Sequence, residues 1–184
     1  MACPTYCATA LPEFSVNNCN ETIASGGKNA ILFNCQSEAV ANSDYTTATI
    51  QADIAAGYAT VMESLMIDAP DASPNPAAAS YVAGVEPKTK NYTQTLTISD
   101  ENVSVANDTA YEDLDATTGN EIAAIIVTTA GGHSELYEAI TAFTTTITKP
   151  VSGSVDDSIH YVATVTGKML HKSKMIATPA NIYS

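Results

Sequence analysis

Three segments of the chain alternate apolar and polar residues with a period of two, the pattern of a strand with one buried face. They span residues 45–54, 89–99 and 159–168. In 45–54 the even-numbered residues, which include Ile50 and Ile54, are predicted to face inward. In 89–99 threonines occupy one face, and the pattern leaves open which face of the first half is buried.

Continuous apolar runs predict further strands. Residues 28–34 form a short run between loop residues, and residues 121–129 form a longer run that we expect at the centre of a sheet. A glycine pair should turn the chain into another strand over 134–148. Residues 58–67 fit a strand and a helix equally well, because the segment is too short for periodicity to decide.

Residues 107–118 have the clearest helical pattern, with Asn107 or Asp108 as candidate N-cap and Gly119 suited to end the helix. Acidic residues fill its first turns, where they complement the helix dipole. Stretches rich in Pro, Gly, Asn or other polar residues predict loops at 1–27, 37–44, 69–79 and 150–158. Three prolines in the third of these predict that it has no regular structure.

These elements together predict a mainly β protein with one helix, built as an antiparallel β-sandwich or barrel. The length of 184 residues favours a single domain. We expect an irregular N-terminal arm over residues 1–27, the β domain over 28–170 and a C-terminal tail over 171–184.

The charge of the chain limits the partners that it can attract. Seven lysines and no arginine stand against 20 acidic residues, which gives a net charge of -13. Proteins that bind nucleic acid attract phosphates with clustered Lys and Arg, so an attractive nucleic-acid site is not expected. Threonine is abundant, with 24 of 184 residues, and favours strands.

The sequence does not predict a membrane protein. It contains no apolar run of the length that a transmembrane helix requires. Its first residues carry no positive charge and no continuous apolar block, so we expect neither a signal peptide nor a membrane partner.

Four cysteines lie within the first 35 residues: Cys3, Cys7, Cys19 and Cys35. Three interpretations stay open. The cysteines form two disulfides that fasten an arm with little core of its own, they bind zinc with a spacing that fits no standard pattern, or they are free thiols, as reducing cytosol favours.

No motif for nucleotide binding, zinc proteolysis or serine hydrolysis is present. Acidic residues that are neighbours in the sequence do not follow the calcium-loop pattern. Nothing in the sequence fixes the distance between two carboxylates that catalysis by a glycosidase needs. We therefore expect no enzyme activity, no cofactor and no metal site. The only basic cluster consists of Lys168, His171, Lys172 and Lys174, which either pairs with a neighbouring subunit or is a solvated tail.

From Gly26 to Lys168 the order of elements resembles phage major tail tube proteins, especially those of phages of Bacteroidetes-type hosts. Residues 26–34 resemble the family's opening Gly-Gly, apolar strand and Asn. Residues 91–98 resemble its Tyr-x-Gln-x-Leu strand, and 161–168 resemble its closing strand, which ends in Gly-Lys. The four cysteines, the Pro-rich loop and the Gly-Gly-His turn depart from the family pattern.

This resemblance implies a homohexameric ring that stacks into a tube in the virion tail, assembled in the host bacterial cytoplasm. The implied partners are copies of the chain and other tail or connector proteins. Viral DNA would pass through without specific binding, because a carboxylate-lined lumen repels phosphate. The candidate lumen-facing acids are Asp53, Asp100, Glu101, Glu121, Glu135 and Glu138.

Two other classes of protein fit the same strand pattern. One is another phage structural protein, such as a capsid decoration, head-fibre or head-tail connector component. The other is a non-viral β-sandwich module for surface display or adhesion. The high negative charge is also explained by solubility alone.

Overall fold

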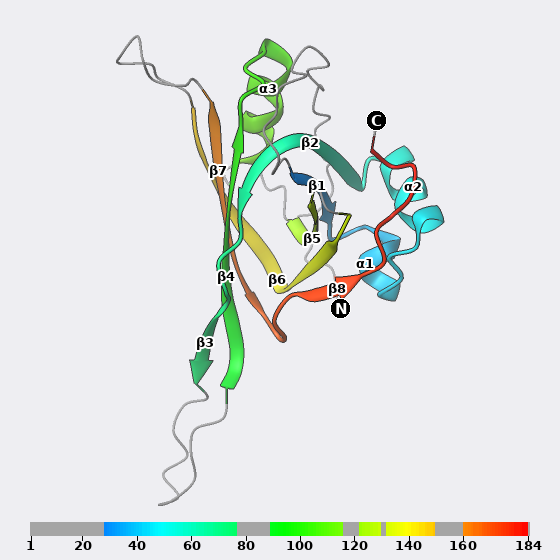
Figure 1. Ribbon diagram of the computed structural model, residues 1–184, viewed down its shortest axis with the longest axis vertical. Helices are drawn as coiled ribbons and strands as arrows, with labels where there is room; N and C mark the ends of the chain where they lie inside the picture. Colours follow the sequence, from blue (N-terminus) through cyan, green and yellow to red (C-terminus); the bar gives the residue numbers. More distant parts are fainter. Residues whose placement is uncertain (1–27, 77–88, 116–121, 130–131, 150–159, 184) are drawn as a thin grey trace, which may run out of the picture.

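The computed structural model describes residues 28–76, 89–115, 122–129, 132–149 and 160–183 (Figure 1). Over these ranges the chain is mainly antiparallel β-sheet with few helices. The expected N-terminal arm, the loop at 150–158 and the helix-ending Gly119 lie outside the described residues. None of the described helices is long and apolar enough to cross a membrane.

The described elements follow one another from β1 to β8 with three helices among them. They are β1 (Lys28–Asn34), α1 (Glu38–Asn42), α2 (Thr47–Ala55), β2 (Ala59–Asp68), β3 (Ser73–Pro76), β4 (Thr89–Asp100), α3 (Val105–Leu114), β5 (Ile122–Thr129), β6 (Ser134–Thr148), β7 (Tyr161–Met169) and β8 (Lys174–Ile176). The strand order is β2-β1-β5-β6-β7-β4-β3, β8 pairs with β6, and β2 also pairs with β4.

The sheet has two halves, which share strands β2 and β6. The first half contains β1, β5 and β8, and the second half contains β3, β4 and β7. The initial part of β6 pairs with β5 and β8 in the first half, whereas Thr144–Thr148 pairs with β7 in the second half. The register of β6 against β5 shifts between these two parts.

Strand β2 passes from one half to the other at a sharp bend, visible as an arch in Figure 1. Residues 59–65 pair with β1, and Met66–Asp68 pair with β4. At the bend Ser64 has a positive φ of 63°, and its N–H donates to Asn29 Oδ1 at 3.0 Å. The register against β1 shifts at this point, which is how a β-bulge redirects a strand.

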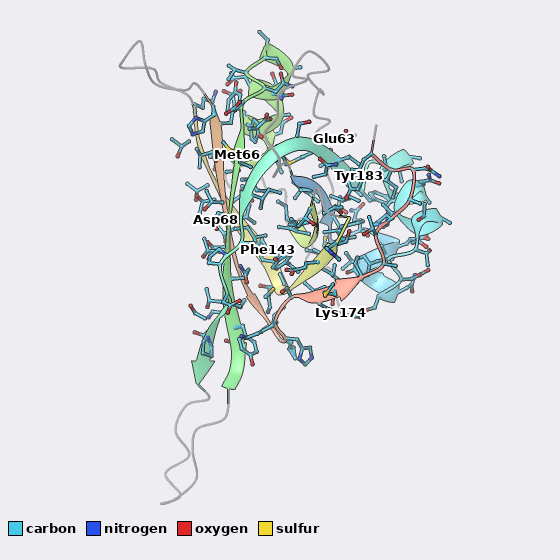
Figure 2. The ribbon with its side chains drawn as sticks, in the orientation of Figure 1. Glu63, Met66, Asp68, Phe143, Lys174 and Tyr183 are labelled. Carbon is cyan, nitrogen blue, oxygen red and sulfur yellow. The ribbon has the colours of Figure 1, made fainter. Side chains whose placement is uncertain are left out.

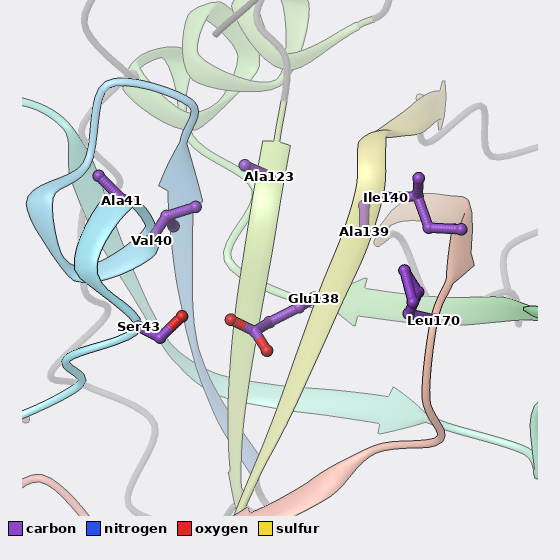
Figure 3. Close-up of a pocket in the computed structure, with 8 residues that line it drawn as sticks. All are labelled: Val40, Ala41, Ser43, Ala123, Glu138, Ala139, Ile140 and Leu170. Atoms are coloured by element: carbon purple, nitrogen blue, oxygen red, sulfur yellow. The ribbon is translucent and has the colours of Figure 1, made fainter. Parts of the chain in front are cut away.

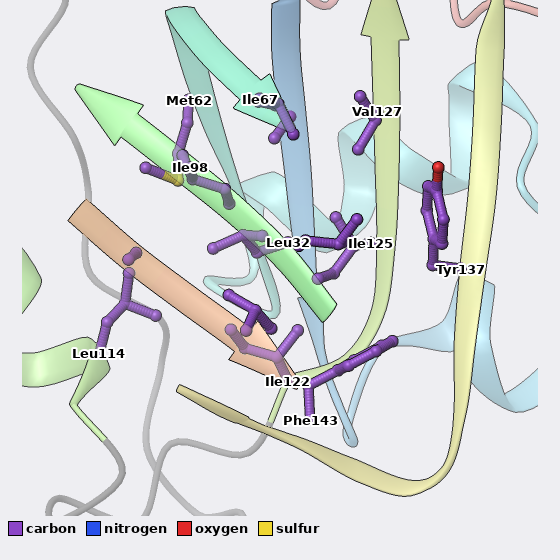
Figure 4. Close-up of a cluster of buried hydrophobic side chains, with 14 of the residues drawn as sticks. Leu32, Met62, Ile67, Ile98, Leu114, Ile122, Ile125, Val127, Tyr137 and Phe143 are labelled. Atoms are coloured by element: carbon purple, nitrogen blue, oxygen red, sulfur yellow. The ribbon is translucent and has the colours of Figure 1, made fainter. Parts of the chain in front are cut away.

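The largest group of buried side chains draws on both halves of the sheet. Leu32 of β1, Leu96 of β4, Ile125 of β5 and Val165 of β7 belong to it, and α3 adds Leu114 (Figure 4). Each of these side chains is at most 1% exposed. Burial of an aliphatic side chain of this size stabilises the fold by roughly 1.5–3 kcal/mol.

A second buried group lies on the other face of the first half. It combines Phe33 of β1 and Ile126 of β5 with Ile50 of α2, and Tyr183 packs against it from the C-terminal end. Residues 122–128 of β5 are consequently buried on both faces. This explains the continuous apolar run and confirms the prediction of a central strand, since β5 lies between β1 and β6.

The prediction of a strand over residues 45–54 is wrong, because most of this segment forms helix α2. Ile50 and Asp53 are its buried residues, at the three-residue spacing of one helix face. The alternation of Ile50 and Ile54 with small residues also fits a helix, since these two positions are four apart. Because Asp53 is acidic although it is buried, the inward face of the helix does not appear as a row of apolar residues in the sequence.

Two predicted loops also contain regular structure. The connection 37–44 includes α1, which Ser37 caps by accepting a hydrogen bond from the Val40 N–H. The Pro-rich segment 69–79 includes β3, which pairs with β4. Proline is tolerated there because β3 has no strand partner on its other side among the described residues, and an edge strand needs fewer amide donors.

The other predicted elements are confirmed with small changes of boundary. The segments 28–34, 89–99, 134–148 and 159–168 contain strands, as does the ambiguous 58–67. The predicted helix begins two residues earlier than expected, at Val105, and Ser104 rather than Asn107 caps it. The expected C-terminal tail contributes β8 and packs Ile182 and Tyr183 on the sheet.

Gly167 of β7 lies against the ring of Phe143, so that an added Cβ would overlap the ring carbons. We expect Gly167→Ala to lower the free energy of unfolding by about 1–3 kcal/mol, the usual cost of overpacking. Urea unfolding checks this value. If the ring is the cause, the same substitution should cost less in a Phe143→Leu background, and an equal cost in both backgrounds would contradict the explanation.

Candidate functional site

Asp53, an expected lumen-facing acid, is only 2% exposed. Its Oδ2 accepts hydrogen bonds from the Ser37 hydroxyl at 2.6 Å and the Ala39 N–H at 3.0 Å, and its Oδ1 accepts one from the Glu38 N–H at 3.0 Å. These amides belong to the first turn of α1, where no helical carbonyl is available to them. Asp53 therefore fastens α1 to α2 and is not available to line a channel.

Asp100, another of the expected lumen acids, is 4% exposed at the end of β4. It accepts hydrogen bonds from the Asn102 N–H at 2.7 Å, the Tyr111 hydroxyl at 2.9 Å and the Asn107 side-chain amide at 3.3 Å. Tyr111 also stacks on Tyr161 of β7, with ring centroids 4.5 Å apart. Asp100 therefore holds α3 on the sheet, and its burial contradicts a place on a channel wall.

The remaining acidic candidates divide into three cases. Glu101 is exposed just after β4. Glu135 and Glu138 lie on β6 and accept hydrogen bonds from the hydroxyls of Tyr137 and Tyr45, at 2.6 and 2.7 Å. Glu121 is outside the described residues. The structure does not bring these carboxylates together on one face.

A pocket of about 240 Å³ lies between α1, β5, β6 and the end of β7 (Figure 3). Its walls include Val40, Ala123 and Leu170, and Glu138 is the only ionisable residue among the described residues that line it. Burial and the neighbouring Glu138 carboxylate raise the pKa of Tyr45.

No group of three or more metal-ligating side chains occurs within the described parts of the chain. Cys35 is disulfide-bonded, and Cys3, Cys7 and Cys19 lie outside the described residues. Buried Cys35 packs with Ala123 of β5 and Val40 of α1, so the disulfide is anchored close to the pocket.

The four basic candidates all lie on the surface, around the connection from β7 to β8. Lys168 is near the end of β7, His171 and Lys172 follow it, and Lys174 begins β8 (Figure 2). Leu170 and Met175 are exposed large apolar side chains in the same stretch. This surface is called the basic end below.

The second half of the sheet carries an outward face of small hydroxyl side chains. In two rows across the strands, Thr144, Thr166 and Thr95 are partners in register, and so are Thr146, Thr164 and Thr97. The inward residues of β4 are Gln94, Leu96 and Ile98, which settles the face that the sequence left open. The six threonines of these two rows carry no charge, whereas Asp68 of β2 is the register partner of Thr97, and Lys168 follows Thr166 on the outward face of β7.

Strand β6 leaves one backbone edge open in the second half of the sheet. Residues Thr144–Thr148 pair with β7 on one side, and no described strand pairs with their other side. Its residue pattern is exposed, buried, exposed, half-buried and exposed. An edge of β-branched residues without proline is a ready partner for another strand.

Comparison of the chain with protein-family models, with curated proteins and with solved structures found no match. The open β6 edge and the hydroxyl face were not predicted as features of a site. The sequence signal was present in the repeated Thr-x-Thr spacing of 93–97, 144–148 and 164–166, which places hydroxyls on one face of each strand.

Burial raises the pKa of Asp100 above its ordinary value near 3.8, and its three hydrogen bonds offset this only in part. The folded state then retains a proton that the unfolded state has released. The contribution of Asp100 to stability is full below pH 3.8 and declines as pH rises through the folded pKa.

Asp100→Asn should remove this dependence. Urea unfolding across the acidic to neutral range checks it: the free energy of unfolding of the wild type, minus that of the variant, should fall as pH rises. A difference that is constant or that increases with pH would contradict the shift.

Proposed function

We propose that the protein is a structural subunit that associates with copies of itself into rings and a tube, as a major tail tube protein of a phage does. On this proposal the protein is not an enzyme, and its place is in the virion tail. The observation that carries the proposal is the open edge of Thr144–Thr148. The resemblance of the sequence to tail tube proteins supports it.

Because no described strand pairs with the outer side of Thr144–Thr148, its backbone donors and acceptors would be offered to a strand of a neighbouring copy. Pairing of this kind extends a sheet across subunits and removes an exposed edge, which is otherwise an aggregation hazard. It makes hydrogen bonds along the backbone, and the side chains of alternate residues supply specificity. A closed ring of such contacts would join the second halves of successive copies.

The hydroxyl face of the second half suits the wall of a DNA channel. Its threonines bind water and carry no positive charge, so they do not neutralise phosphates in the way that gives cationic grooves their affinity. The proposal therefore changes in one respect from the acidic lumen that the resemblance implies. The two rows of threonines supply an uncharged centre to this wall, with the acid Asp68 beside Thr97, and the acids Glu101, Glu135 and Glu138 remain candidates for its margins.

The edge is tested with Thr144→Lys/Thr146→Lys, which places two charges on the open strand. We expect this variant to remain folded and to lose the ring assembly that depends on the β6 edge, because solvated lysines on an edge strand oppose pairing with another strand. Light scattering after size-exclusion chromatography and negative-stain electron microscopy measure the assemblies, and circular dichroism checks the fold.

The matched control is Thr164→Lys/Thr166→Lys. It adds the same charges on the same face, at the register partners in β7, which is not an edge strand. It should assemble like the wild type. A wild-type chain that stays monomeric at every concentration, or an edge variant that assembles as well as the control, would overturn the proposal.

A further inference from the structure

The basic end combines exposed apolar side chains with a rim of positive charge. Met175 is 68% exposed, and Leu170, five residues before it in the sequence, is 57% exposed. The surrounding basic residues are Lys168, His171, Lys172 and Lys174. Glu135 is the register partner of Met175 and accepts a hydrogen bond from Tyr137. A patch with an apolar centre and a charged rim is typical of protein interfaces.

A second patch of the opposite charge surrounds the beginning of α3. Val105, the first helical residue, is 87% exposed, and Val103 is exposed two residues before it. The rim is acidic, with Glu101 before the helix and Glu112 and Asp113 on it. Asp108 and Glu112 already form an ion pair with Lys149, so one positive charge lies within this surface. This surface is called the acidic end.

The two ends lie at opposite ends of strand β7. Tyr161, the first residue of β7, pairs with Asp100, which Glu101 and the acidic end follow directly. The basic end begins at the other limit of the strand, around Met169. Nine strand residues separate them by about 30 Å. Four of the five large apolar side chains that are exposed in the described residues belong to these two ends.

We propose that the basic end of one copy of the chain binds the acidic end of the next copy. Apolar residues would meet at the centre of the contact, and lysines would face carboxylates around it. Because the chain has a net charge of -13, most other pairs of surfaces repel one another. This contact adds to the proposed function a way of joining successive rings, because repeated head-to-tail contacts would stack them along a tube. Only the stacking of rings rests on the proposed function.

Charge reversal with mutual rescue tests this contact. The first variant is Lys172→Glu/Lys174→Glu, and the second is Glu101→Lys/Asp113→Lys. Both are made in the Thr144→Lys/Thr146→Lys background, so that association through the β6 edge does not contribute. Each variant alone should associate at least about tenfold more weakly than the background protein. An equimolar mixture should regain association, because each reversed end then meets a complementary end on the other variant.

Sedimentation velocity at increasing protein and salt concentration measures the association, and circular dichroism confirms folding. The matched control Asp68→Lys/Asp71→Lys makes the same charge change as the second variant at exposed sites near β3, and it should not weaken association. Association of the background protein should also weaken as salt rises, because exposed charges are screened.

A background protein that stays monomeric, reversed variants that associate like their background, or a mixture without rescue would each overturn this contact. These outcomes are distinct from failure of the proposed function, which is judged on the edge variant and its control in an otherwise unchanged chain. Head-to-tail association without any edge-dependent assembly would support the contact and contradict the ring.

Discussion

Two strands that each serve both halves of the sheet hold this structure together. Strands β2 and β6 each pair with strands of one half along part of their length and with strands of the other half along the rest. The two halves therefore cannot separate unless some of the pairing of β2 and β6 is broken. The large core includes side chains from both halves, so its packing depends on these crossings. The bend in β2 is maintained at Ser64 by a positive φ and by the hydrogen bond from the Ser64 N–H to Asn29 Oδ1. The register of β2 on either side depends on this bend.

Some of the acidic residues of the chain are buried and form hydrogen bonds inside the protein. Two of the carboxylates that the sequence suggested for a channel wall are interior groups that satisfy backbone amides and side-chain donors, Asp53 at α1 and Asp100 at α3. Buried charges of this kind require several hydrogen bonds to offset their desolvation, and both have three. Polar contacts thus fasten α1 to α2 and α3 to the sheet, in addition to apolar packing.

An element could be predicted from the sequence where nearby residues determine it, and not where distant parts of the chain determine it. Strand β5 was predictable because burial on both faces leaves a continuous apolar run. Helix α2 was not, because Asp53 occupies a buried position that a pattern of apolar residues does not reveal. The face of β4 and the open edge of β6 depend on which strands lie beside them. The burial of Asp53 and Asp100 likewise depends on donors that tertiary packing or a local turn supplies.

The prolines of β3 give the second half of the sheet unequal margins. Pro74 and Pro76 have no backbone N–H, so half of the residues of β3 have no amide to donate outward or inward. Unlimited growth of a sheet by strand addition, as in amyloid, needs two margins that both accept strands. On the proposed assembly the β6 margin would accept a strand, while the prolines of β3 would oppose strand addition at the other margin of the described sheet, so side chains would have to supply the second contact that a closed ring needs. Prolines at one margin would then also oppose growth of the free chain into fibres.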